Sequence, residues 1–429
     1  MDRVGGGLVE QVDTLIVGGG QAGLAMSAHL SEAGIDHRIL ERDRLVERWR
    51  SARWDSLVAN GPAWHDRFPP HQYDDTAPDA FPTRDSVVRY FETFAQKISA
   101  PVRTGVAVKR VTRRHGAPGF QVETSEGALL ATSVVAATGA FQRPVLPPLL
   151  PKRDDIAQIH SSAYRNPSAL APGAVLVVGA GSSGGQIADE LLRAGRRVFL
   201  SIGPHDRPPR RYRGRDYCWW LGVLGKWDLA AATPGTEHIT ISVSGAGGGV
   251  TVDFRRLAAR GATLLGMVEA WQDNALTLRG DLAQNIAAGD ANYLSVLDEA
   301  DAFVKAQGLT LPEEPEARLL PPAPGCVTQP IRRLDPAAEG ITTIVWATGY
   351  ARDDRWIDLD VFDPEGRPKH QRGVTSVPGF YFLGLPWQSR RGSSFIWGVW
   401  HDARYLADQI GIQGAYRAYH NAASARAAE

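Results

Sequence analysis

Two glycine-rich stretches have the residue types and spacing of a turn that binds a dinucleotide. The pattern G-x-G-x-x-G occurs in LIVGGGQAGLAMSAHL and again in VLVVGAGSSGGQIADEL. The first glycine allows a sharp bend, the second lets the backbone approach a pyrophosphate, and the third lets the next helix pack on the preceding strand. Free N–H groups at the start of that helix then face the phosphates. The predicted binding residues are Gly18, Gly20, Gln21, Ala22 and Gly23 in the first turn, and Gly179, Gly181, Ser182, Ser183 and Gly184 in the second.

The end of the following strand indicates which dinucleotide each turn binds. Glu41 stands there in the first unit, and a carboxylate at this place accepts hydrogen bonds from a ribose diol, which predicts FAD. The matching residue of the second unit is Ser201, and RPPRRYRGRD follows soon after. A neutral residue with arginines nearby suits the 2′-phosphate of NADPH. We expect Arg207 and Arg210 to bind that phosphate, and the other arginines to lie in a solvated loop.

The elements needed to position these turns are present around both of them. Strands are expected over 13–17 and 174–178, and the helices that follow end at Gly34 and Gly195, which are suitable C-terminal caps. This context separates the two patterns from chance matches in a chain with 45 glycines. Two strand–turn–helix starts predict an α/β fold with two Rossmann-like dinucleotide-binding domains.

Composition excludes several other classes of protein. A chain of 429 residues can form two or three domains, and its 47 basic and 47 acidic residues give no global reason to bind nucleic acid or an acidic membrane. Apolar runs are too short for a membrane span, and MDRVGGGLVEQVD has no apolar signal core. Cys218 and Cys326 lack CxxC or zinc spacing, so we predict no metal site and a cytoplasmic location.

Several further stretches resemble the flavin-containing monooxygenases. They are WDSLVANGP, ATGAFQRPVLPPLLP, IHSSAYRNP, PRRYRGRD, ATGY and GFYFLGL, together with both glycine turns. The chain is similar to the plant indole-pyruvate (YUCCA-type) enzymes and to the Baeyer–Villiger enzymes. It is most similar to a bacterial branch often labelled flavoproteins involved in potassium transport. The resemblance runs from about residue 13 to residue 410.

The resemblance implies both a domain order and an activity. A discontinuous FAD domain is expected over 1–165 and 335–429, with an NADPH domain inserted over 166–334. An apolar stripe at helical spacing adds a helical insertion near 281–308. In the implied cycle NADPH reduces the flavin, O2 adds to flavin C4a, and the hydroperoxide transfers one oxygen atom to a small organic substrate. N-, S- and carbonyl oxygenation stay open, and a homodimer is allowed.

Individual residues also match family positions. Asn60 matches an asparagine beside the flavin that helps to keep the hydroperoxide, and Trp49 and Val108 match positions that line FAD. His160 matches the histidine of the signature F-x-G-x-x-x-H-x-x-x-[YFW], whose start is not kept here, since Asp154 and Ile156 replace its Phe and Gly. Two roles stay open for His160, a proton-transfer group and a hinge residue that holds a domain junction by hydrogen bonds, and the second is favoured.

Aromatic residues are candidates to line a substrate cavity at the domain junction. These candidates are Trp219, Trp220, Trp397 and Trp400. Two alternative functions stay open besides oxygen transfer: a reductase or dehydrogenase with the same two domains, and a redox-sensing regulator that is not an enzyme. The sequence does not name the substrate.

Overall fold

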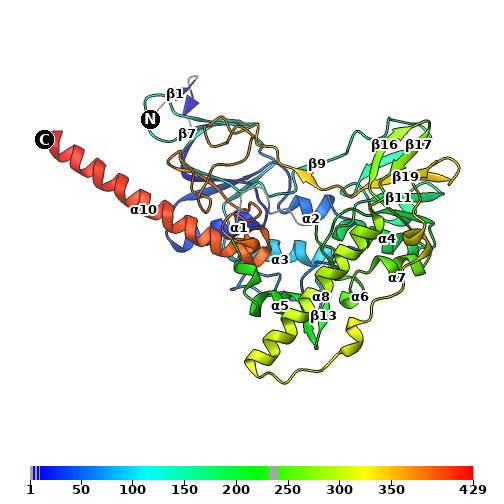
Figure 1. The fold of residues 1–429 in the computed structure, drawn as a ribbon. Helices are drawn as coiled ribbons and strands as arrows, with labels where there is room; N and C mark the ends of the chain where they lie inside the picture. Colours follow the sequence, from blue (N-terminus) through cyan, green and yellow to red (C-terminus); the bar gives the residue numbers. More distant parts are fainter. Residues whose placement is uncertain (1–2, 5–6, 9, 231–239, 429) are drawn as a thin grey trace.

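The computed structural model describes residues 3–4, 7–8, 10–230 and 240–428, and it contains two α/β units that lie side by side (Figure 1). In the first unit the strands follow the order β5-β4-β3-β8-β7-β6, and β21 also pairs with β8. They are β3 (Glu10–Val17), β4 (His37–Glu41), β5 (Val102–Thr104), β6 (Val108–Arg113), β7 (Phe120–Thr124), β8 (Gly127–Ala136) and β21 (Phe380–Phe382). Strands β5, β4, β3, β8 and β21 are parallel, and β3 and β8 are largely buried, as expected for apolar runs covered on both faces. Strand β7 pairs antiparallel with both β8 and β6.

The second unit has a fully parallel sheet in the order β10-β19-β11-β12-β15. Its strands are β10 (Ala157–His160), β11 (Ala174–Val178), β12 (Val198–Ser201), β15 (Thr263–Leu265) and β19 (Ile341–Trp346). A small antiparallel sheet follows it, formed by β16 (Val268–Gln272), β17 (Ala275–Leu278) and β18 (Arg333–Leu334). The predicted α/β fold with two Rossmann-like units is confirmed.

The second sheet extends beyond the range expected for the second domain by one strand at each end. We expected the second domain to span 166–334, but β10 precedes this range and β19 follows it, and both belong to the second sheet. The two strands pair with each other in register from Ala157–Thr343 to His160–Trp346. This pairing joins segments far apart in the sequence, so the local pattern could not show it.

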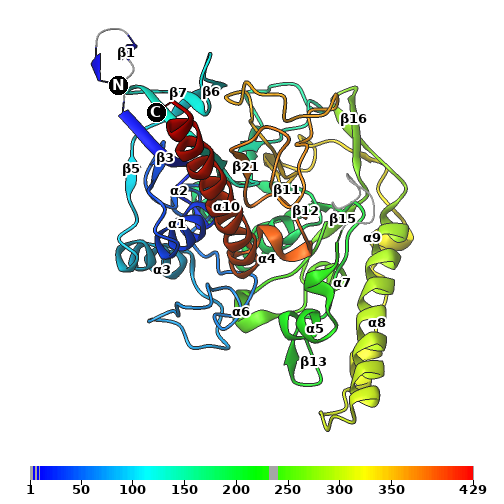
Figure 2. The ribbon, with the colours of Figure 1, turned by 90° about the vertical axis from the view of Figure 1, so that its left-hand side faces the viewer.

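Helices flank both sheets (Figure 1). They are α1 (Gln21–Glu32), α2 (Glu47–Ser51), α3 (Arg84–Lys97), α4 (Ser182–Arg193), α5 (Tyr217–Val223), α6 (Ala246–Gly249), α7 (Phe254–Ala259), α8 (Leu282–Gln307), α9 (Gly325–Thr328) and α10 (Ile396–Ala428). The helix expected near 281–308 is α8, which lies along the second unit in both views (Figures 1 and 2). α10 packs on α1 and then extends away from the body.

Short strand pairs complete the fold. They are β1 (Arg3–Val4) with β2 (Gly7–Leu8), β9 (Arg143–Pro144) with β20 (Tyr350–Ala351), and β13 (Arg211–Tyr212) with β14 (Arg215–Asp216). The pair β9–β20 lies where the chain leaves the first unit and where it returns. It therefore ties the two crossings together.

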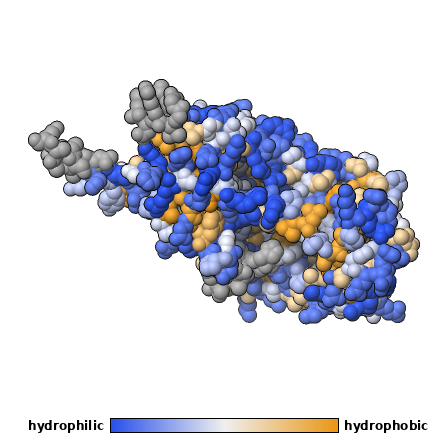
Figure 3. Space-filling view, turned by 90° about the horizontal axis from the view of Figure 1, so that it is seen from above, coloured by the Kyte–Doolittle hydropathy of each residue, from blue (hydrophilic) through white to orange (hydrophobic). Residues whose placement is uncertain are grey.

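The surface shows no extended apolar face in the view from above, where hydrophobic residues gather in separate small areas (Figure 3). Across the described ranges, every helix is too short or too polar to span a bilayer.

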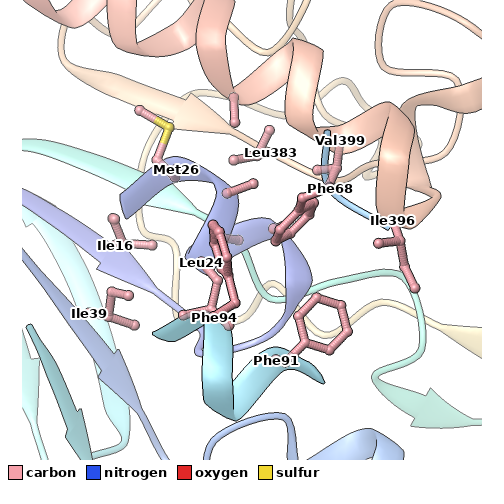
Figure 4. Close-up of a cluster of buried hydrophobic side chains, with 14 of the residues drawn as sticks. Ile16, Leu24, Met26, Ile39, Phe68, Phe91, Phe94, Leu383, Ile396 and Val399 are labelled. Carbon is pink, nitrogen blue, oxygen red and sulfur yellow. The ribbon is translucent and has the colours of Figure 1, made fainter. Parts of the chain in front are cut away.

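The core that supports the first glycine turn lies between its sheet, α1, α3 and the start of α10 (Figure 4). Phe68 is fully buried there, with its ring centroid 5.6 Å from that of Phe91 and 4.9 Å from that of Phe94, both edge-on. Such contacts add to the free energy of burying the rings.

We expect Phe94→Ala to lower the free energy of unfolding by about 3–5 kcal/mol, because it opens a cavity in this aromatic cluster. Tyr416→Ala is the matched control: Tyr416 is 69% exposed on α10, and its loss should change stability by less than about 0.5 kcal/mol. Denaturant titration of both variants measures the difference. Equal midpoints would show that the cluster does not carry the stability assigned to it.

Candidate dinucleotide and oxygen site

The first glycine turn is built so that no side chain fits at two of its three glycines. Gly18 has φ 114°, and a Cβ there would lie 2.6 Å from the carbonyl oxygen of Ala137. A Cβ on Gly23 would lie 2.0 Å from the carbonyl oxygen of Gly18. A Cβ on Gly20 would meet nothing within 4 Å, and Gly20 lines the cavity. The turn thus presents bare backbone to the cavity, as a pyrophosphate requires.

The second turn repeats this geometry. Gly179 has φ 128°, and its Cβ would lie 2.4 Å from the carbonyl oxygen of Ala347. A Cβ on Gly184 would lie 1.9 Å from the carbonyl oxygen of Gly179. Both helices, α1 and α4, have a glycine as N-cap, Gly20 and Gly181, which has no side chain to cap the first turn. The N–H of Ser182 donates to the carbonyl oxygen of Ile241 at 2.9 Å, so the N–H groups available to an anion are those at the start of α1 and those that follow Ser182 in α4.

Both turns open into one cavity of about 2180 Å³ between the two units. A pocket for a single small ligand has roughly 300–1,000 Å³, so this space can hold more than one large ligand. It is lined by most of the residues predicted from the sequence: Gly18, Gly20, Gln21, Ala22, Glu41, Trp49, Asn60, Val108, Gly179, Gly181, Ser182, Ser183, Ser201 and Arg210. Gly23 and Gly184 lie behind the turns, where their role is packing.

Glu41 is held at the end of β4 with its carboxylate beside the first turn. Its Oε2 accepts a hydrogen bond from the amide of Gly19 at 2.7 Å, and Oε1 accepts one from the amide of Asp43 at 2.9 Å. Each carboxylate oxygen keeps a further lone pair for a ligand. The residues around the first turn therefore fit FAD, with Glu41 available to its ribose.

Ser201 places a neutral side chain at the end of β12. Its hydroxyl donates to the carbonyl oxygen of Gly266 at 2.9 Å, and the side chain is buried. Ser182 is likewise engaged, since its hydroxyl donates to the carbonyl oxygen of Ile241 at 3.0 Å and accepts from the amide of Val243 at 3.2 Å. The second turn thus fits a nucleotide pyrophosphate through its backbone more than through its serine side chains.

Arg207, which we expected to bind the 2′-phosphate, lies away from the cavity in the structure. Its side chain is 3% exposed and does not line the cavity. Its Nη2 lies 2.6 Å from Oδ1 of Asp290 on α8, and the guanidinium also lies 4.6 Å above the ring of Tyr293. A buried guanidinium needs such a partner, and here it fixes α8 to the second unit.

Arg210 does line the cavity, but its charge is already paired. Its Nε donates to Oδ2 of Asp216 at 3.0 Å, its Nη2 pairs with Oδ1 of the same carboxylate, and its side chain is 2% exposed. Its Nη1 donates to the main-chain oxygen of Asn60 at 2.5 Å. Arg210 therefore joins the second unit to the Asn60 loop, and it brings no unpaired positive charge.

Asn60 belongs to the first unit and is held by two residues of the second. Besides the bond from Arg210, its side-chain Oδ1 accepts a hydrogen bond from Nε2 of Gln186 at 2.8 Å. Gln186 lies on α4, and its Nε2 also donates to the carbonyl oxygen of Val243 at 2.9 Å, which fixes the orientation of its amide. With Oδ1 engaged, the two N–H donors of Asn60 are left for the cavity that it lines.

His160 does not line the cavity and therefore is not placed for proton transfer to a bound ligand. Its Nε2 donates to the carbonyl oxygen of Gly349 at 2.9 Å, its Nδ1 accepts from the amide of Ser162 at 3.1 Å, and its ring packs 4.8 Å from that of Tyr350. Burial lowers the pKa of His160. These contacts match the favoured role of a residue that holds a domain junction.

The four tryptophans expected around the substrate do not line the cavity. Trp220 is fully buried beside α8, and Trp219, Trp397 and Trp400 also contact the hydrophobic clusters. The aromatic lining comes from other residues, among them Trp227, Tyr217 and Trp387. Sequence reasoning also missed Gln186, since its place two residues after Gly184 gives no sign that it reaches Asn60.

Comparisons with known proteins agree with this geometry. The family described as pyridine nucleotide-disulphide oxidoreductase matches residues 15–213. An uncharacterized CzcO-like oxidoreductase of Geobacillus kaustophilus is 34% identical over 403 residues, which cover 93% of this chain and 98% of the relative. The chain belongs to the CzcO-like oxidoreductases. Its predicted membership of the wider flavin-containing monooxygenase family is confirmed, and members of these families use FAD and NADPH.

Three further similarities accompany this CzcO-like assignment. The indole-3-pyruvate monooxygenase YUCCA1 of Oryza sativa subsp. japonica is 32% identical over 192 residues, or 44% of this chain and 47% of that protein. A flavin-containing monooxygenase from Stenotrophomonas maltophilia has a TM-score of 0.63 at 20% identity, with 94% of this chain and 99% of that chain covered. The bacillithiol disulfide reductase of Bacillus cereus has a TM-score of 0.61 at 18% identity, covering 94% and 100%. The two structures show that the fold is shared.

We expect Gly23→Ala to abolish FAD binding and Gly184→Ala to abolish coenzyme binding, because each Cβ would lie at or within 2.0 Å of a backbone oxygen. Gly325→Ala is the control, since a Cβ there meets nothing within 4 Å. The flavin content of purified protein and coenzyme titration measure the two losses. Full retention of FAD by Gly23→Ala would place the flavin elsewhere.

Proposed function

We propose that the protein is an FAD- and NADPH-dependent monooxygenase that transfers one oxygen atom from O2 to a small organic substrate. The observation that carries this proposal is Asn60, a polar side chain of the first unit that lines the cavity shared by both dinucleotide turns and is fixed by Gln186 and Arg210 of the second unit. The similarity to named monooxygenases supports the reaction class. We place the enzyme in the cytoplasm, because NADPH is a coenzyme of reducing metabolism inside cells.

The chain's own residues bind and orient, while the flavin supplies the redox and oxygen chemistry when it is bound. The start of α1 and the carboxylate of Glu41 hold the FAD pyrophosphate and ribose. The start of α4 holds the coenzyme pyrophosphate. Asn60 offers its N–H donors to a partly negative oxygen in the cavity, and Gln186 keeps the amide turned that way.

A reductase without oxygen transfer is the competing function, and the match to the disulphide oxidoreductase family supports it. Among the described residues, however, no cysteine pair faces the cavity: Cys218 lines it and Cys326 does not. Rapid mixing of the reduced enzyme with O2 separates the two functions. A transient absorbance band distinct from oxidised and reduced flavin supports the monooxygenase. Direct return to oxidised flavin under all conditions would favour the reductase.

We expect Asn60→Ala to divert electrons from substrate to H2O2 and to leave FAD binding and flavin reduction largely intact, since neither glycine turn is touched. Loss of one placed donor in such sites costs about 2.7–4 kcal/mol, or roughly 10²–10³ in rate. NADPH consumption, H2O2 release and the lifetime of the transient band are measured in parallel.

The orientation of the Asn60 amide can also be tested by changing Gln186. Gln186→Leu removes the donor to Asn60, and Gln186→Glu replaces it with an acceptor that favours the opposite orientation of the Asn60 amide. Both should raise the H2O2 yield, with less effect from Leu than from Glu. If all three variants keep the wild-type yield and band lifetime, Asn60 is a structural residue of its loop.

We expect Ser201→Asp to lower kcat/KM for NADPH by about tenfold or more while changing that for NADH little, because a carboxylate at this place repels a 2′-phosphate and accepts from a 2′-hydroxyl. Arg207→Met is the control. It should weaken the attachment of α8 and lower stability without changing the NADPH-to-NADH ratio. A changed ratio in Arg207→Met would restore Arg207 as a phosphate ligand.

A further inference from the structure

A buried thiol, Cys218, lies close to Asn60 at the same cavity, and the proposed oxygen transfer does not use it. Cys218 is 6% exposed and contributes to the cavity lining. Its Sγ lies 3.7 Å from Nη2 of Arg210, whose Nη1 donates to the main-chain oxygen of Asn60. One guanidinium therefore contacts both the thiol and the Asn60 loop.

His65 approaches the same thiol from the other unit. Its side chain is 8% exposed, its Nδ1 lies 2.8 Å from Oδ1 of Asp66, and its Nε2 has no hydrogen-bond partner in the described structure. Oδ2 of Asp66 accepts from the amide of Gly61 at 2.9 Å, which fixes the carboxylate. The imidazole is thus held by a carboxylate on one side, and it neighbours the Cys218 sulfur.

The surroundings hold this imidazole in place and favour its charged form. Its ring stacks on Trp227 at 5.1 Å and meets the edge of Trp397 at 5.3 Å. Burial alone would lower the pKa of His65, but the Cys218 sulfur and the Asp66 carboxylate outweigh burial and raise it. Reactive cysteines are found beside Arg or protonated His, next to a space that a reactant can enter. Cys218 combines these features.

We propose that Cys218 is a peroxide-reactive thiol, positioned by His65 and Arg210, whose reactant is hydrogen peroxide in the cavity. The Cys218 thiol gives its proton to the His65 imidazole, and the resulting thiolate sulfur attacks one peroxide oxygen, so that an S–O bond forms as the O–O bond breaks. The sulfur loses two electrons and the peroxide gains them. The leaving hydroxide takes the proton of the His65 imidazolium and departs as water, which leaves a sulfenic acid. Only the source of the peroxide, unproductive turnover of the flavin, rests on the proposed function.

Cys326 is the natural comparison within the chain. It lies on α9, is less buried than Cys218, and does not line the cavity. If exposure alone governed reactivity, Cys326 would be oxidised first. The proposal predicts the reverse order.

The experiment treats the FAD-loaded protein with hydrogen peroxide and dimedone, which captures sulfenic acids, and follows each cysteine by peptide mass spectrometry. We expect Cys218 to be labelled about tenfold faster than Cys326. Cys326→Ser should keep the label and Cys218→Ser should lose it. His65→Gln should slow labelling at Cys218 about tenfold, with flavin content and circular dichroism as checks of folding. Equal labelling of both cysteines in the wild type, a result that needs no variant, would overturn the proposal.

A second arm replaces added peroxide with NADPH and air. Labelling of Cys218 in this arm shows that the flavin site supplies the oxidant. If added peroxide labels Cys218 but NADPH does not, the reactive thiol stands and its proposed source of peroxide fails. If neither labels Cys218 while H2O2 accumulates, the thiol proposal fails and the flavin chemistry stands.

Discussion

The absence of a side chain at the third glycine of each turn is the constraint on which the rest of the molecule depends. At Gly23 and Gly184 the following helix starts against the carbonyl of the first glycine, at a distance that no Cβ can share. This contact sets the direction of α1 and of α4. Both helix starts consequently face the same cavity, whose volume leaves room for two dinucleotides.

A short loop supplies polar contacts between the two units, in addition to apolar contacts such as those of Trp54 and Leu57 with the core of the second unit. Residues 60–66 belong to the first unit, yet Asn60 takes hydrogen bonds from Gln186 and Arg210 of the second. Gln186 stands on α4, the helix whose start faces the coenzyme. One rigid element thus carries both the coenzyme turn and the group that orients Asn60. A shift of α4 on coenzyme binding would move Gln186, and with it the Asn60 amide on the flavin side of the cavity.

The sequence was sufficient for features that depend on neighbours along the chain. The two glycine turns, Glu41 at the end of its strand and the helix now seen as α8 all follow from local spacing. It was insufficient where the partner of a residue or strand lies far away in the sequence. Arg207 is followed by four other arginines within the next eight residues, which resembles a phosphate site, but its partner Asp290 lies 83 positions away. β10 and β19 likewise find each other only in the folded sheet.

The pairing of Arg207 and Arg210 with carboxylates also affects how the protein distinguishes NADPH from NADH. A guanidinium removed from water must be paired, and the carboxylates of Asp290 and Asp216 meet that need from within the chain. These arginines consequently stabilise the shape of the second unit and offer little attraction to an incoming phosphate. What remains at the ribose position is Ser201, whose hydroxyl is itself engaged by Gly266. Ser201 can then favour NADPH only by being uncharged. An acid at this strand end would repel the 2′-phosphate, and Ser201 does not.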